Sequence, residues 1–368
     1  MERKIKIAQV IGKAAAGGVE AMIMNLYRNI DREKVQFDFF VEQTSTIIDE
    51  DEIKKLGGNV VIIPPYKNPL HYMKELTRLF REGNYDIVHS NMNAISVFTL
   101  RAAKKAGIKY RIAHSHSTSN KKEVLKSIVK NMLRPFSKKY ATDYFACSEL
   151  AGRWLFGNKA VEENKVTIIN NAIDIQKFAY KEEIREQIRN QYNITDKFVM
   201  GHVGRFVKQK NHKFLVDIFN EVQKIRPDAV LLLIGEGPLC DQTYEYVDKL
   251  GLKDKVIFAG VQKDTSKFYQ AMDCFVLSSL YEGLPVVGIE AQANLLPCIF
   301  ADTITKEVKV NDNVQFASLD LSAAGWAKMI CDVGPRETNN KIENSKYDIQ
   351  GEAKKLASLY EKILEEVK

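Results

Sequence analysis

The stretch CFVLSSLYEGLPVVGIE, residues 274–290, joins an apolar run to a helical pattern through a short turn. Cys274–Leu277 is typical of a buried strand, and Leu284–Gln292 has the spacing of a helix. This pattern places Glu282 at the mouth of the helix and Glu290 about two turns further on, so that the carboxylates lie roughly 12 Å apart along the axis. A strand that leads directly into a helix is the repeating element of a parallel α/β sheet.

The same alternation extends over most of the chain. The expected strands are residues 5–11, 35–41, 60–63, 85–89, 109–114, 198–203, 229–234, 256–259 and 274–277. The expected helices are residues 19–28, 51–56, 70–81, 94–106, 214–225, 242–250, 266–272, 284–292 and 351–368. Such alternation, with loops of about 2–6 residues, predicts parallel sheets covered by helices on both faces. We therefore expect an α/β protein with two facing Rossmann-like, doubly wound domains and a cleft between the carboxyl ends of their sheets.

The strand–helix pattern restarts after residue 178, which sets the expected domain boundaries. An N-terminal domain is expected over residues 1–173 and a C-terminal domain over residues 174–350. Residues 351–368 form an amphipathic helical pattern with one apolar face, made of Leu356, Leu359, Ile363 and Val367. We expect this last helix to pack back on the N-terminal domain.

The composition is that of an ordinary globular protein, with 45% hydrophobic and 27% charged residues in a chain of 368. This excludes disordered and low-complexity classes. No apolar run approaches the ~18 residues of a membrane-spanning helix, and the first apolar stretch is too short for a signal peptide. The five cysteines are widely spaced without a CxxC motif. Neither a disulfide framework nor a zinc site is expected, and a cytoplasmic location fits.

Charge is unevenly distributed along the chain. Residues 1–177 carry 29 Lys+Arg and 19 Asp+Glu, a net charge of +10, whereas residues 178–368 carry 25 and 28, a net charge of −3. The basic half indicates an anionic partner. Residues 121–139 combine seven basic side chains with apolar ones, which suits an amphipathic helix on an anionic membrane surface. A packed helix with a solvated face is the alternative; nucleic acid is disfavoured, because no recognised binding motif is present.

A glycine-rich turn follows the first expected strand. Gly12 is followed by Gly17-Gly18 and then by a helix, so backbone N–H groups there can approach a phosphate. The turn is neither a Walker A loop nor a GxGxxG dinucleotide fingerprint. A plain strand–helix turn is the alternative interpretation.

A second candidate site follows the first strand of the C-terminal half. Gly204-Arg205 and Lys210-Asn211 frame a loop in which Asn211 is expected to cap the next helix. Arg205 and Lys210 then lie at the carboxyl end of a strand, where two fixed cations can neutralise a diphosphate without a metal.

Together these motifs resemble the retaining, nucleotide-sugar-dependent glycosyltransferases of family 4, which have the two-domain GT-B fold, and in particular the enzymes of bacterial capsule and exopolysaccharide synthesis. The resemblance is carried, in chain order, by Gly17-Gly18, Gly204-Arg205 with Lys210, Gly235-Glu-Gly-Pro238, Phe258-Ala-Gly260-Val261, and Glu282 with Glu290.

The resemblance implies a role for each of these positions. Gly17 and Gly18 approach the donor diphosphate, which Arg205 and Lys210 hold. Val261 lies near the nucleobase, and Glu290 binds the ribose. The remaining implied contacts involve the donor sugar and its phosphate: Glu282 for the sugar hydroxyls, the amides of Gly283 and Leu284 for the phosphate, and His116, with His114 beside it, near the reacting carbon. The catalytic set is therefore His116, Glu282, Arg205 and Lys210.

Two stretches depart from the family pattern. Leu296 precedes Pro297 where the family often has glycine, and Ala301–Thr305 replaces a glycine pair and a nearby glutamate. These departures concern the sugar pocket more than the nucleotide contacts. Asp49-Glu50-Asp51 matches the DxD pattern of metal-dependent glycosyltransferases, but an acidic run is also typical of a helix start. We expect no metal and no cofactor.

The predicted activity is transfer of a sugar from a nucleoside diphosphate sugar, UDP-linked, to a hydroxyl of a lipid-linked saccharide. The enzyme is expected on the inner face of the cell membrane, held there peripherally. Three alternatives stay open: a nucleotide-sugar epimerase of the same architecture, a non-catalytic subunit that binds nucleotide sugar or membrane, and an NAD-dependent dehydrogenase, against which the missing GxGxxG counts.

Overall fold

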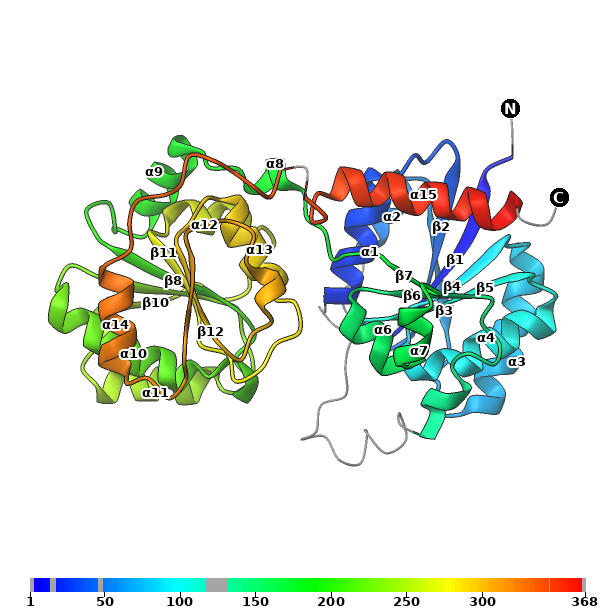
Figure 1. The fold of residues 1–368 in the computed structure, drawn as a ribbon, viewed down its shortest axis with the longest axis horizontal. Coiled ribbons are helices and arrows are strands. Elements are labelled where there is room, and N and C mark those ends of the chain that lie inside the picture. Colours follow the sequence, from blue (N-terminus) through cyan, green and yellow to red (C-terminus); the bar gives the residue numbers. More distant parts are fainter. Residues whose placement is uncertain (1–2, 14–17, 46–48, 117–131, 344, 366–368) are drawn as a thin grey trace. The chain divides into compact units, whose positions relative to one another are not determined.

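A computed structural model describes residues 3–13, 18–45, 49–116, 132–343 and 345–365 of the chain. Two compact units emerge from the contacts (Figure 1). Unit 1 comprises Met1–Ala172 with Ile349–Lys368, and unit 2 comprises Ile173–Asp348. The C-terminal segment thus belongs to the unit that contains the N-terminus.

Unit 1 is built on a seven-stranded parallel sheet with the order β3-β2-β1-β4-β5-β6-β7. Its strands are β1 (Ile5–Gly12), β2 (Val35–Glu42), β3 (Asn59–Ile63), β4 (Ile87–Ser90), β5 (Tyr110–Ser115), β6 (Asp143–Ala146) and β7 (Val166–Ile168). Its α-helices are α1 (Gly18–Asn29), α2 (Glu50–Lys55), α3 (Pro69–Gly83), α4 (Ser96–Ala106), α6 (Glu149–Phe156), α7 (Asn158–Glu162) and α15 (Ile349–Glu365). The order of the strands reverses between β1 and β4, and this reversal is the switch point of a doubly wound sheet.

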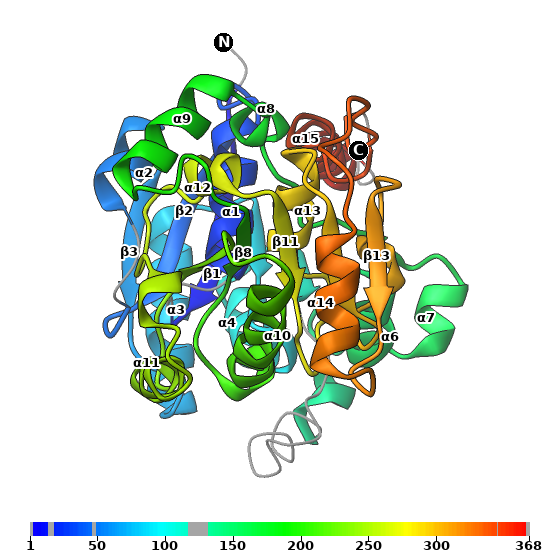
Figure 2. The same ribbon diagram turned by 90° about the vertical axis from the view of Figure 1, so that its left-hand side faces the viewer.

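Unit 2 has a six-stranded parallel sheet with the order β10-β9-β8-β11-β12-β13. Its strands are β8 (Val199–Val203), β9 (Val230–Ile234), β10 (Val256–Phe258), β11 (Cys274–Leu277), β12 (Cys298–Ala301) and β13 (Val314–Ala317). Its α-helices are α8 (Ile175–Phe178), α9 (Glu182–Gln191), α10 (His212–Ile225), α11 (Cys240–Lys249), α12 (Ser266–Ala271), α13 (Val286–Ala293) and α14 (Ala323–Cys331). Helices α10 and α14 lie side by side on one face (Figure 2), and the switch point falls between β8 and β11.

Strand alternation in unit 1 divides its core into two layers. Ile7 and Phe39 point to one face, where α1 and α15 cover them, whereas the neighbouring Ala8 and Phe40 point to the other. Successive side chains of a strand point to opposite faces of the sheet, so a strand that is apolar at consecutive positions needs helices to cover both faces. The predicted α/β class with two parallel sheets is therefore confirmed.

The helix after β11 differs from the sequence-based prediction in its start. It begins at Val286 with Pro285 in the preceding position, not at Leu284. A residue before proline is pushed out of helical geometry, so Leu284 cannot continue the helix backwards. Glu282 consequently lies in the loop, and the 12 Å axial spacing to Glu290 does not apply.

Asn211 also behaves differently from the prediction. It precedes α10, but its backbone is left-handed, with a φ of 57°, and its side chain makes no capping hydrogen bond. Its Nδ2 instead donates to the carbonyl of Ser278 at 3.2 Å. Asn211 therefore joins two loops rather than capping a helix.

Helix α15 is part of the core of unit 1, and Leu356 tests this directly. Leu356 is 1% exposed within the layer that contains Ile7 and Phe39. We expect Leu356→Ala to lower the free energy of unfolding by about 2–5 kcal/mol, measured by urea denaturation. Ser358→Ala, on the exposed side of the same helix, is expected to change it by less than ~0.5 kcal/mol. Equal effects of the two substitutions would contradict the assignment of α15 to this core.

Candidate active site at the carboxyl ends of the strands

Three loops of unit 2 are hydrogen-bonded together where β8, β9 and β10 end. Gly204 N donates to Ile234 O at 2.9 Å, Phe206 N to Glu236 O at 2.9 Å, and Gly235 N to Gly260 O at 2.9 Å. Gly235 has a φ of +129°, and a Cβ on it would collide with the carbonyl of Gly204. The glycines therefore let backbone approach backbone, which builds a rigid floor at this edge of the sheet.

The loop after β8 is tied to the loop after β11 across the switch point. Leu280 N donates to Gln209 O at 2.8 Å, and Gln209 Nε2 donates to Tyr281 O at 3.0 Å. Lys210 Nζ lies 2.6 Å from Glu282 Oε1, and both side chains are mostly buried, at 16% and 11% exposed. Ligands of doubly wound sheets bind at this point, outside the carboxyl ends of the strands.

The Glu282 carboxylate is fixed on both oxygens. Oε1 accepts from Ser279 Oγ at 3.0 Å as well as from Lys210, and Oε2 accepts from Gln209 Nε2 at 3.1 Å. The backbone of Glu282 also forms a β-bridge with Ile304, and Thr303 Oγ1 donates to Ser279 O at 2.8 Å. The stretch 301–305, which departs from the family pattern, thus lies directly beside Glu282.

Glu290 lies within α13 and is held by a tyrosine. Tyr269 OH donates to Glu290 Oε2 at 2.7 Å, and burial raises the pKa of the Glu290 carboxyl. Its second oxygen, Oε1, has no hydrogen-bonding partner among the described residues and can accept from a ligand hydroxyl.

The other predicted positions of unit 2 are more open. The Arg205 side chain is exposed, and no described residue forms an ion pair with it. Val261 is 68% exposed. Gly283 and Leu284 lie in the loop before α13, and within the described ranges their backbone N–H groups have no acceptor. The structure therefore joins Lys210 directly to Glu282, while no hydrogen bond or ion pair among the described residues connects Arg205, Val261 or Glu290 to that pair.

Two predicted contacts lie at the carboxyl ends of strands in unit 1, after β1 and after β5. Gly18 begins α1, whereas Gly17 lies outside the described residues, as does the segment 117–131 of the predicted basic helix. His116 follows β5 and is half-buried; its backbone N donates to Asn93 Oδ1 at 2.7 Å, and its Nε2 lies 2.9 Å from Asn91 Oδ1. Its ring stacks on His114 with the centroids 4.0 Å apart.

Asp49, from the DxD-like run, has a local structural role. Its Oδ1 accepts from Glu52 N at 2.9 Å and caps α2. A carboxylate at a helix N-terminus stabilises the helix, which accounts for an acidic run at this place.

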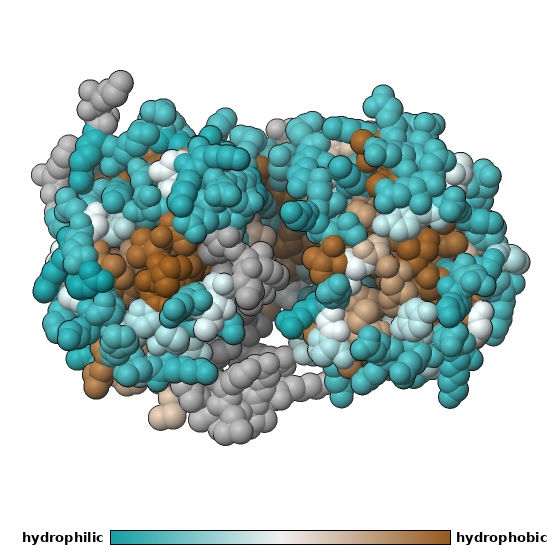
Figure 3. Space-filling view, turned by 180° about the vertical axis from the view of Figure 1, so that it is seen from behind, coloured by the Kyte–Doolittle hydropathy of each residue, from teal (hydrophilic) through white to brown (hydrophobic). Residues whose placement is uncertain are grey.

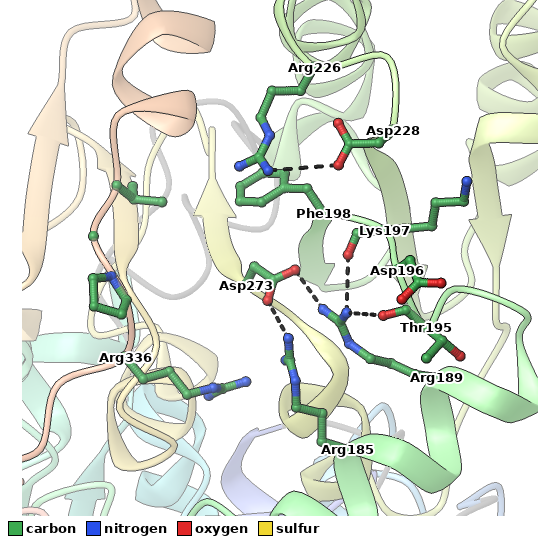
Figure 4. Close-up of a pocket in the computed structure, with 13 residues that line it drawn as sticks. Arg185, Arg189, Thr195, Asp196, Lys197, Phe198, Arg226, Asp228, Asp273 and Arg336 are labelled. Carbon is green, nitrogen blue, oxygen red and sulfur yellow. Dashed lines mark hydrogen bonds and ion pairs between the residues drawn. The ribbon is translucent and has the colours of Figure 1, made fainter.

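A cavity of 460 Å³ lies at the opposite edge of the unit 2 sheet, where β8 and β11 begin (Figure 4). Arg185 and Arg189 point at Asp273, at 2.5 and 2.6 Å. Arg336 donates to the carbonyls of Gln270 and Met272 at the end of α12. Because their terminal nitrogens are already engaged in this way, these arginines bind α9 and α12 to the sheet and offer few donors to a ligand.

Sequence reasoning missed the residues that hold the site in place. Gln209, Ser279 and Tyr269 fix the two glutamates, but a hydroxyl or amide in a loop or helix carries no pattern of its own. Gln209 could have been found from its place beside Lys210. Tyr269 lies eight residues after Val261, the nearest predicted motif, and only the packing of α12 against the sheet brings it to Glu290.

Two α/β units, each with a parallel, doubly wound sheet, are the architecture of GT-B glycosyltransferases. Residues 16–177 match the family model described as "Glycosyltransferase Family 4", and residues 184–318 match "Glycosyl transferases group 1". The chain is 35% identical over 335 residues to EpsF of Bacillus subtilis, named as a glycosyltransferase, covering 88% of this chain and 86% of that protein. The chain belongs to this glycosyltransferase family and is a transferase.

Other relatives extend the comparison to polysaccharide synthesis. A UDP-Gal:alpha-D-GlcNAc-diphosphoundecaprenol alpha-1,3-galactosyltransferase of Escherichia coli is 27% identical, covering 81% of this chain and 80% of that one. The capsular polysaccharide glycosyltransferase CapH of Staphylococcus aureus is 25% identical, covering 97% and 98%. Anabaena HepE, solved with UDP, has the same fold, with a TM-score of 0.71, 18% identity and coverage of 98% and 99%.

The stacked histidines of unit 1 predict a loss of stability on acidification. Burial lowers the pKa of His89 and of His116 to about 3, from 6.5, so the unfolded chain takes up protons that the folded chain excludes. Stability is full above pH ~6.5 and falls toward pH ~3, by up to about 1.4 kcal/mol per pH unit for each imidazole. We expect a lower urea midpoint at about pH 5 than at about pH 7.5, and a weaker pH dependence for His116→Asn. Identical midpoints at the two pH values would contradict this account.

Proposed function

We propose that the protein transfers a sugar from a UDP-linked donor, with retention of anomeric configuration, to a hydroxyl of a lipid-linked saccharide in capsular or exopolysaccharide synthesis. The observation that carries this proposal is the Lys210–Glu282 pair at the unit 2 switch point. A cation for the diphosphate and a carboxylate for sugar hydroxyls are there held side by side. The names of the Escherichia coli and Staphylococcus aureus relatives support the substrate classes.

The salt bridge holds the Lys210 ammonium and the Glu282 carboxylate in place before the donor binds. When a diphosphate binds, the Lys210 ammonium turns from Glu282 to the phosphate oxygens, and the Glu282 oxygens become free for the sugar. Gln209 and Ser279 keep the carboxylate in place during this exchange. Preorganised groups of this kind stabilise the transition state without reorganisation at the moment of reaction.

The reaction breaks the bond between the anomeric carbon and the diphosphate. Negative charge grows on the leaving phosphate, where Lys210, Arg205 and the free N–H groups of Gly283 and Leu284 meet it, with Gly17 and Gly18 as further backbone donors. The phosphate takes the proton of the acceptor hydroxyl, so no separate base is needed. Because side chains supply the cations, we propose a reaction without metal or cofactor.

The remaining assigned residues orient the donor. Glu290, with Oε1 available, binds the ribose hydroxyls, and the exposed Val261 lies against the nucleobase. His116, on unit 1, offers a ring nitrogen to the sugar near its reacting carbon.

The Lys210–Glu282 exchange predicts different effects for its two members. Glu282→Gln keeps the shape and frees Lys210, so UDP binding is retained while transfer falls about 10- to 100-fold through loss of charged hydrogen bonds worth ~1.5–3 kcal/mol. Lys210→Ala and Arg205→Ala lower transfer by about 10²–10³, and Lys210→Ala also weakens UDP binding. Thermal shift with UDP and transfer from UDP-sugars measure the two effects.

Lys208→Ala is the matched control, since Lys208 lies in the same loop, is exposed, and has no contact with Glu282. It is expected to behave as the wild type. Near-normal transfer by both Glu282→Gln and Arg205→Ala would overturn the proposal. Interconversion of the donor sugar in an incubation without acceptor would favour the epimerase.

We also propose that unit 1 binds the anionic surface of the membrane peripherally, from the cytoplasmic side. Apolar side chains reach the molecular surface in patches (Figure 3). Met132 and Phe136 are 69% and 50% exposed, next to the exposed Lys138 and Lys139. Apolar side chains flanked by cations suit the boundary between lipid headgroups and acyl chains. None of the helices in the described ranges is long and apolar enough to span a bilayer.

Phe136→Asp is expected to weaken sedimentation with phosphatidylglycerol vesicles several-fold, because it removes apolar area and adds a like charge to the lipid surface. Ile225→Asp makes the same change at a side chain of unit 2 that is 53% exposed, and is expected to leave binding unchanged. Binding to phosphatidylcholine vesicles as strong as to anionic ones, at any salt concentration, would reject the electrostatic component.

A further inference from the structure

A chain of buried hydrogen bonds connects His116 to the C-terminal helix. Tyr360, on α15, is completely buried and accepts from Gln9 Nε2 at 2.9 Å. Gln9 Oε1 in turn accepts from Asn91 Nδ2 at 3.0 Å, and Asn91 Oδ1 lies 2.9 Å from His116 Nε2. Four residues that are up to 351 positions apart therefore form one continuous chain.

This chain of hydrogen bonds determines which ring nitrogen of the neutral His116 side chain carries the proton. Since the Asn91 amide nitrogen donates to Gln9, its oxygen is the acceptor, and His116 must donate to it from Nε2. A neutral imidazole has a single N–H, so Nδ1 of His116 is left with a bare lone pair. Among the described residues, Nδ1 has no hydrogen-bonding partner.

A second branch from Tyr360 runs through the other histidines. The Tyr360 hydroxyl accepts from Gln9 and donates its own proton to His89 Nδ1 at 2.7 Å. His89 then donates from Nε2 to His114 Nδ1 at 2.9 Å. This second branch of hydrogen bonds ends at His114, whose ring stacks on that of His116.

We propose that Tyr360 is a positioning residue that sets the tautomer and the orientation of His116, so that Nδ1 is the acceptor offered to a sugar hydroxyl. This inference rests on the proposed function for the role of His116. In this proposal α15 contributes to the reaction as well as to packing, because its Tyr360 hydroxyl is the group at which both branches of hydrogen bonds begin. The chemistry recognised is an O–H group of the donor, not an anion.

The test compares Tyr360→Phe with Tyr27→Phe. Tyr27 is equally buried, belongs to the same core layer and donates to the carbonyl of Leu56 at 3.2 Å, but it is not part of the chain. Long-range ¹⁵N spectra of the side chains of the six histidines, assigned by single His→Gln variants, report each tautomer without any need for activity. We expect Tyr360→Phe to shift the His116 and His89 resonances, and Tyr27→Phe to leave them in place.

Kinetics provide the second readout. Tyr360→Phe is expected to lower kcat about 10-fold, with little change in the donor KM, because it removes both buried hydrogen bonds of the hydroxyl, to Gln9 and to His89. In the His116→Ala background the same substitution is expected to add no further loss, as for residues that act in one network. Gln9→Met interrupts the same chain and replaces Tyr360→Phe if that variant does not fold.

Unchanged His116 resonances in Tyr360→Phe, or fully additive losses in the double variant, would overturn the inference. Failure of the proposed function is distinguishable from this. If His116→Ala transfers sugar at the wild-type rate, the assigned role of His116 is wrong, while the ¹⁵N spectra still decide whether Tyr360 sets its tautomer.

Discussion

The salt bridge between Lys210 and Glu282 is the interaction on which the site of unit 2 depends. Removing one partner of such a mostly buried pair leaves a charge without compensation, which is strongly unfavourable. The pair joins the loops after β8 and β11, the two strands between which the chain order reverses. At that reversal the connections diverge to opposite sides of the sheet, and the salt bridge adds to the hydrogen bonds by which Gln209 ties the two loops together.

The close approach of two backbone loops supports the Lys210–Glu282 pair. The loops after β8 and β9 lie so near one another that only glycine fits at position 235. Rigid loops hold Gln209 and Ser279 at the two oxygens of Glu282, which fixes the carboxylate before a ligand arrives. In the proposed function, the same contacts at this edge therefore serve both stability and donor binding, whereas the arginine cluster around Asp273 at the opposite edge ties α9 and α12 to the sheet.

Unit 1 uses a different principle, a buried polar chain in place of a salt bridge. Buried imidazoles stay neutral because desolvation opposes the charged form. A neutral imidazole has two possible tautomers, and its neighbours select one. Since those neighbours include Tyr360, the last helix of the chain contributes to the same edge of the sheet as the first strand.

Much of the fold followed from the sequence alone. Apolar runs alternating with helical patterns predicted the α/β class and the parallel sheets, the resemblance of the motifs predicted the family, and these predictions are confirmed. Local periodicity sufficed, because each strand and helix is marked by its own side chains. The start of the helix at Val286 was missed, since the effect of Pro285 on Leu284 is a backbone constraint that a hydrophobic pattern does not show.

Tertiary structure alone decided which side chains meet. The sequence placed Lys210 and Glu282 in separate motifs, and only the pairing of β8 with β11 brings their charges to 2.6 Å. Nothing in the pattern of residues 349–365 distinguishes Tyr360 from any other core residue, and only the packing of α15 on unit 1 brings its hydroxyl to Gln9 and His89. Periodicity is a local property that is visible in a short stretch of sequence, whereas contact across a switch point depends on the order of the strands in the folded sheet.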